Sequence, residues 1–81
     1  MINETRAKIN EDKLNFYLLK QYKVHITKED GEWLNGILVE KEAEGVYILK
    51  ESKFGLMHIF ISEIKEVEEY HGEKEKEAEN L

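Results

Sequence analysis

The 81 residues of this chain provide length for one domain with a small hydrophobic core. There is no cysteine, which excludes disulfides and fits a reducing compartment. The histidines are scattered, so we expect neither a metal site nor a cofactor. No apolar run approaches the roughly 20 residues that span a bilayer, and the first residues lack the order of a signal peptide. We therefore expect a cytoplasmic protein whose small core is supplemented by oligomerisation.

Charge is distributed unevenly along the chain, whose formal net charge is -6. Residues 68–81 contain six acidic and two basic side chains and so carry -4 of this charge. The rest of the chain is nearly balanced, unlike a strongly basic nucleic-acid-binding domain. Because residues 70–81 are charged, repetitive and poor in apolar side chains, we expect them to form a disordered acidic tail. Such a tail repels phosphate or competes with it for basic sites.

One short helix is predicted near the N-terminus, over residues 11–21, after a flexible segment at residues 1–9. Asn10 is a candidate N-cap, and the acidic residues after it suit the first turn, where the helix dipole favours negative charge. A narrow apolar stripe follows on one helix face. Phe16 and Leu19 lie off this stripe, and they either cover an edge of the sheet or contact a neighbouring subunit. The stripe consists of Leu14, Tyr17, Leu18 and Gln21.

Five short strands are predicted between residues 22 and 68. From Tyr22 onward, apolar and polar residues alternate with a period of two, as in a half-buried strand. An Asp-Gly pair at residues 30–31 is a strong hairpin signal. Gly36, within the second strand, marks a bend or a close backbone approach. The dense apolar run at residues 56–61 predicts a strand buried on both faces.

Several short motifs occur in order along residues 9–67, and their order and spacing resemble those of the Sm-like family, in particular its bacterial Hfq proteins. This resemblance implies a mostly β fold with one N-terminal helix, an SH3-type bent five-stranded antiparallel barrel over residues 10–69. It also implies edge-to-edge pairing of strands four and five into a homo-oligomeric ring, for which we expect a hexamer. The motifs are Ile9-Asn10-Glu11, Leu14-Asn15, Val24-His25-Ile26, Asp30-Gly31, Leu34-Asn35-Gly36-Ile37-Leu38, Val46-Tyr47-Ile48-Leu49-Lys50 and the segment from Leu56 to Ile64, which ends in Ile61-Ser62-Glu63-Ile64.

The motifs that carry RNA binding in the Hfq proteins are largely missing from this chain. The family has a Tyr-Lys-His triplet at the inner pore, where this chain has Met57-His58-Ile59. The family also has a pore-facing aromatic near the position of Glu44-Gly45, where this chain has none. Of residues 18–21, which stand where the family has an arginine-rich rim, only Lys20 is basic. The fold therefore transfers from the family more securely than the RNA site.

Six residues are candidates for RNA contact under this resemblance. Asn10 stands where the family has a glutamine that reads a uracil edge, although we favour its role as a helix cap. Trp33 lies on the face opposite Leu34 and either stacks a base on the family's purine-binding face or packs against a neighbour or the helix. Asn35 shares that face and is suited to read an adenine edge. The six are Asn10, His25, Thr27, Trp33, Asn35 and His58.

Two functional hypotheses follow, and neither is an enzyme, because the carboxylates lie in turns and in the tail, with no apolar cleft to shift their pKa. The first is a ring that binds single-stranded RNA, as an RNA chaperone or riboregulator does, without DNA or membrane partners. The second is a protein-interaction scaffold ring that has kept the barrel and lost the RNA site. The acidic balance favours the second hypothesis, whereas the resemblance favours the first, which we prefer. In an RNA-binding ring, the acidic tail is expected to be dispensable for assembly and to limit RNA binding.

Overall fold

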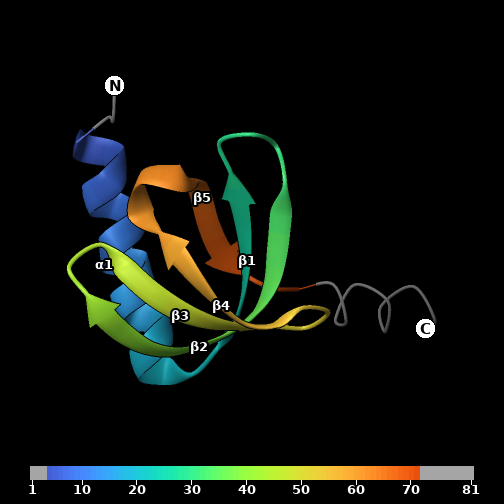
Figure 1. The fold of residues 1–81 in the computed structure, drawn as a ribbon. Coiled ribbons are helices and arrows are strands. Elements are labelled where there is room, and N and C mark those ends of the chain that lie inside the picture. Colours follow the sequence, from blue (N-terminus) through green and yellow to red (C-terminus); the bar gives the residue numbers. More distant parts are fainter. Residues whose placement is uncertain (1–3, 72–81) are drawn as a thin grey trace.

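The computed structural model describes residues 4–71, which form one helix followed by a five-stranded antiparallel sheet (Figure 1). The acidic tail predicted at residues 70–81 falls almost entirely outside this range. Between β4 and β5 the chain makes one turn of 3-10 helix, Ile61–Glu63. The other elements are α1 (Glu4–Lys20), β1 (Lys23–Lys28), β2 (Trp33–Ala43), β3 (Val46–Glu51), β4 (Gly55–Phe60) and β5 (Ile64–Glu69).

Helix α1 is longer than the sequence pattern predicted, because it begins at Glu4 rather than at residue 11. The expectation of a flexible segment at residues 1–9 was therefore wrong for residues 4–9. Asn10 lies inside the helix and is buried, so its prediction as the N-cap was also wrong. Its amide nitrogen donates to the backbone carbonyl of Ile64 at 3.2 Å. This tertiary contact, together with an ion pair between Arg6 and Glu29, ties the first turns of α1 to the sheet.

The sheet has the strand order β4-β3-β2-β1-β5, which places β4 and β5 at its two opposite edges. These two strands are nevertheless consecutive in the chain and are joined only by residues 61–63. The four residue steps from Phe60 to Ile64 span at most about 14 Å. The edges of a flat five-stranded sheet are four strand spacings apart, roughly 19 Å, so a flat sheet is incompatible with this connection. The sheet therefore curls until its edges approach each other, as the curved ribbons in Figure 1 show.

Strand β2 passes through the most crowded point of this bend at Gly36, as the sequence predicted. Gly36 pairs with Glu51 of β3, and a Cβ atom added to it would lie 2.2 Å from the carbonyl oxygen of Lys50. Only a residue without a side chain permits the two backbones to approach so closely. The pairing of β2 with β3 also shifts register twice beyond this point, between Leu38 and Glu40 and between Lys41 and Ala43. These irregularities add to the bend.

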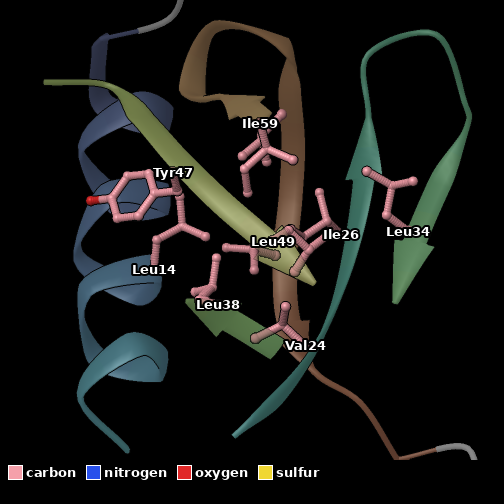
Figure 2. Close-up of a cluster of buried hydrophobic side chains, with 10 residues drawn as sticks. Leu14, Val24, Ile26, Leu34, Leu38, Tyr47, Leu49 and Ile59 are labelled. Carbon is pink, nitrogen blue, oxygen red and sulfur yellow. The ribbon is translucent and has the colours of Figure 1, made fainter. Parts of the chain in front are cut away.

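The core fills the concave side of the curled sheet and is closed on one side by α1 (Figure 2). Along β1, β3 and the first half of β2, alternate residues are buried, in agreement with the period of two in the sequence. In β4 the inward residues are less covered, and Ile59 alone among them is buried; Leu56 and Phe60 are 68% and 42% exposed. The prediction that this strand is buried on both faces was therefore wrong for the single chain. The core consists of Leu14, Val24, Ile26, Leu34, Leu38, Tyr47, Leu49, Ile59, Ile64 and Val67.

Gly36→Ala tests whether this close backbone approach is required for the fold. We expect a loss of about 3 kcal/mol or more in the free energy of unfolding, at the upper end of ordinary overpacking, because backbone atoms must move apart. Gly31→Ala is the matched control, since open space surrounds Gly31 and only its positive φ of 91° is unfavourable. The control should lose about 1–2 kcal/mol. Urea titration at equal protein concentrations measures both, and equal losses would contradict the argument.

Candidate nucleic-acid interface

The convex outer face of β1 and β2 carries four of the six residues that the sequence singled out. Leu34 and Leu38 point into the core, so Trp33 and Asn35 point outward on the same strand, as predicted. The antiparallel register places Thr27 of β1 opposite Trp33 and His25 opposite Asn35. Trp33 is 54% exposed, which leaves much of its indole ring available to a ligand.

His25 and Asn35 form a hydrogen-bonded pair beside the indole ring of Trp33. The His25 Nδ1 atom lies 2.6 Å from the side-chain oxygen of Asn35. Because an amide oxygen only accepts hydrogen bonds, this contact places a proton on Nδ1. The imidazole and indole centroids are 5.7 Å apart, with an angle of 35° between the rings. Asn35 thus orients His25 against Trp33, and its amide oxygen already accepts one hydrogen bond.

Glu51, at the end of β3, is a buried carboxylate that the sequence analysis did not single out. Its Oε2 accepts the backbone N–H of Asn35 at 3.0 Å, and its Oε1 accepts those of Lys53 at 2.5 Å and Phe54 at 3.0 Å. Burial by itself raises the pKa of Glu51, but these three N–H groups and the nearby Lys53 ammonium outweigh it, so the pKa is lower than usual. The carboxylate therefore stays charged and joins β2 to the turn that follows β3.

Two hollows lie on this part of the surface, and Glu51 borders both of them. The first, of about 260 Å³, is lined by the aromatic residues Trp33 and Phe54 and also by Gly31, Glu32 and Lys53. Phe54 is 72% exposed and belongs to the turn between β3 and β4.

The second hollow, of about 280 Å³, lies across the middle of the same face. It has a lysine on either side of Ile37, because Lys23 of β1 and Lys50 of β3 are both cross-strand partners of that residue. Gly36 and Ser52 complete its lining. The face therefore combines aromatic and cationic side chains within one short stretch of sheet.

Asn10 and His58 do not join this cluster. Asn10 is buried in α1, on the other side of the sheet, where its amide nitrogen bonds to β5 carbonyls. His58 lies on the outer side of β4, opposite Ile48, and its Nε2 is 2.6 Å from a carboxylate oxygen of Glu42. The structure thus separates the six predicted residues into a group of four on β1 and β2 and two isolated positions.

A metal-binding group of three or more His, Cys, Asp or Glu side chains does not occur within residues 4–71. Within the same range, the structure contains no helix with the length and hydrophobicity of a membrane span.

One signal in the sequence pointed to Glu51. Tyr47, Leu49 and Glu51 occupy alternate, inward positions of β3, and an acidic residue at an inward position is unusual. Phe54 gave no such signal, because an aromatic residue in a loop has no periodicity to interpret.

Glu51→Gln tests the role of this carboxylate. One side-chain oxygen becomes an amide NH₂, so at least one backbone N–H loses its acceptor, and we expect a loss of about 1–3 kcal/mol at pH 7. Because the folded-state pKa is lowered, the carboxylate stabilises the fold above its ordinary pKa, and this contribution disappears as the pH falls through the folded value. The difference between wild type and variant should therefore shrink below about pH 4.

Urea titrations from pH 3 to 7 measure this dependence. Glu66→Gln is the control, because Glu66 is exposed on β5. A Glu51→Gln difference that stays constant down to pH 3, or a control that behaves in the same way, would contradict the assigned role.

The fold that carries this site also occurs in a known protein. No protein-family model matches the sequence, and no curated protein matches it. A crystal structure described as the pleiotropic translational regulator Hfq is similar, with a TM-score of 0.64 and 20% sequence identity. The match covers 86% of this chain and 100% of that one. At this identity the similarity establishes the fold alone, and it confirms the predicted architecture. The chain has the Sm-like fold of Hfq, one N-terminal helix followed by a bent five-stranded antiparallel sheet.

Proposed function

We propose that this protein binds single-stranded RNA on the outer face of β1 and β2, as a homo-oligomeric ring of Sm-fold subunits. The observation that carries the proposal is the half-exposed Trp33 with His25 oriented against it. Aromatic side chains held on an open sheet stack unpaired bases, which is a common way of binding single strands. The similarity to a translational regulator with the same fold supports this assignment.

The outer face is a better candidate for RNA than the position that corresponds to the family's pore. His58 is the one basic candidate there among residues 57–59, and it is paired with Glu42. Asn10, the counterpart of a base-reading residue, is buried and bonded within the subunit. On the outer face, by contrast, Trp33 is accessible, and Lys23 and Lys50 lie on the neighbouring strands. We therefore expect a preference for A-rich over U-rich RNA.

Ring assembly is proposed from the two edges of the sheet. Strands β4 and β5 do not pair with each other in the described part of the chain, where they form the ends of the sheet. A small cavity of about 20 Å³ lies along this seam, lined in part by Phe60 and Ile64. Unpaired edges with exposed apolar side chains aggregate unless another strand covers them. Pairing of β4 with β5 of the next subunit satisfies both edges, and a closed hexamer is the expected product, in the cytoplasm.

The second candidate function is a scaffold ring that binds proteins and no RNA. The pairing of His58 with Glu42 favours it, because this contact places a carboxylate where an RNA site needs positive charge. The net charge of -6 acts in the same direction. In such a ring the Trp33 face would be a protein contact, and no RNA affinity would be measurable even at low salt.

Trp33→Ala should weaken binding to a short A-rich RNA by about 1–3 kcal/mol for one stacked base, about 5- to 150-fold in Kd. Fluorescence anisotropy of labelled A-rich and U-rich oligonucleotides at low salt measures this change. Phe16→Ala is the control, because Phe16 is a half-exposed aromatic residue on α1, away from the proposed face. Unchanged affinity of Trp33→Ala would remove Trp33 from the site. Absence of binding by the wild type would favour the scaffold.

Phe60→Glu should break the ring into smaller species, because Phe60 lines the seam between the sheet edges and a buried charge there is costly. Val39→Glu is the control, since Val39 is similarly exposed but lies on the central strand β2 and not on either edge strand. Light scattering and sedimentation velocity at micromolar concentration distinguish the species. A wild-type monomer under these conditions would refute the ring.

A further inference from the structure

Trp33 and Phe54 face the same hollow from different parts of the chain, and the residues around them suggest one ligand. We propose that these two side chains form the walls of a site for a single unpaired base of RNA, and that Lys23 and Lys50 bind phosphates of the same strand. This inference rests on the proposed function and extends it to residues that the resemblance did not suggest.

The two walls come from different parts of the sheet, the first residue of β2 and the turn after β3. Trp33 is the first residue of β2, and His25 lies against its ring from β1. Phe54 belongs to the turn after β3, and β3 neighbours β2 on the side away from β1. The hollow between Trp33 and Phe54 is thus open to solvent and bounded by two large aromatic side chains, each more than half exposed. A planar base satisfies both walls by stacking.

The Glu51 side chain holds the backbone near Trp33 and at Phe54. Its Oε2 accepts the N–H of Asn35, two residues from Trp33, and its Oε1 accepts the N–H groups of Lys53 and Phe54. A loop residue held in this way loses little further entropy when a ligand binds, which favours affinity. Glu51 is therefore a positioning residue, because it acts through Trp33 and Phe54 and not by touching the base.

The two lysines of the proposed site, Lys23 and Lys50, lie on either side of β2, further along it from the aromatic walls. Ile37 lies four residues after Trp33, about 13 Å along the strand, and Lys23 and Lys50 are its partners on the two neighbouring strands. The Lys23 ammonium lies 4.5 Å from the ring centroid of Tyr70, which holds it at the end of β1. An extended RNA segment that follows β2 reaches both the aromatic walls and the two lysines.

The charges of the aromatic hollow favour a neutral base over a cationic ligand. Aromatic walls with nearby carboxylates also suit quaternary ammonium groups. Here, however, Glu32 shares the Lys28 ammonium, at 3.8 Å, with Glu63, and Glu51 accepts three backbone N–H groups. Lys53 adds a positive charge to the same lining. These contacts leave the lining closer to neutral than its two acidic residues suggest.

The test compares Phe54→Ala and Lys50→Gln in the full-length protein, by anisotropy of a labelled A-rich RNA at 50–200 mM salt. Phe54→Ala should weaken binding by about 5- to 150-fold at every salt concentration and leave the salt slope unchanged. Phe54→Tyr should restore binding, since it keeps the aromatic face. Lys50→Gln should reduce the slope of log K against log salt by about 0.7, the value for one phosphate contact on a single strand. Phe16→Ala and Lys8→Gln, both on α1, are the matched controls.

Several outcomes would overturn the inference. RNA binding that depends on Trp33 but not on Phe54 would leave the proposed function intact and refute the second wall. Failure of Phe54→Tyr to restore binding would refute aromatic stacking there. Saturable quenching of Trp33, the one tryptophan of the chain, by tetramethylammonium with no effect of RNA would assign the hollow to a cation. If the wild type binds no RNA at low salt, the proposed function fails first.

Discussion

The three residues that join β4 to β5 impose the constraint on which the rest of the structure depends. They connect the two opposite edges of a five-stranded sheet, so the sheet has to curl. The concave face of the curled sheet holds the core, and its convex face carries polar and aromatic side chains. It also requires a point where backbones nearly touch, and Gly36 supplies it. Helix α1 then covers the side of the core that the sheet leaves open, as Figure 1 shows.

The buried polar groups lie where the curled sheet contacts helix α1 or a turn between its strands. Asn10 bonds α1 to β5, and Glu51 bonds β2 to the turn after β3. Tyr47, buried in β3, donates to the side-chain oxygen of Asn15, which connects β3 to α1. Burial, and next the carboxylate of Glu11, raise the pKa of Tyr47 to about 12, so its hydroxyl remains a donor throughout the physiological range. Each of these groups stabilises the fold and also fixes one junction.

The sequence predicted the fold because the signals concerned are local. The change of period at Tyr22, the hairpin glycine at position 31 and Gly36 in the second strand each reflect backbone requirements of a few neighbouring residues. The start of α1 was missed because contacts with β5 and the β1–β2 turn, distant in sequence, hold its first turns. The burial of β4 was overestimated because an apolar run does not tell whether a second layer covers its outer face.

The candidate site was predicted only in part, for a similar reason. Trp33 and Asn35 were placed on one face by strand alternation alone, and the structure confirms that placement. Phe54 reaches the same hollow through a turn whose geometry depends on the Glu51 carboxylate, which no periodic pattern encodes. Asn10 was misassigned because an asparagine side chain can either cap a helix or bond to a distant backbone carbonyl, and only the position of β5 decides between the two.

The two edges of the sheet have a further consequence for symmetry. Strands β4 and β5 are different surfaces, so a contact between them is head-to-tail and cannot form a two-fold dimer with the same patch on both sides. Repeating such a contact produces either a closed ring or an open helical filament, depending on whether the rotation per subunit divides a full circle. That rotation follows from the angle between the two edges, which the bend of β2 at Gly36 helps to set. In a ring of this kind, the bend at Gly36 would therefore bear both on the stability of the subunit and on the number of subunits that close the assembly.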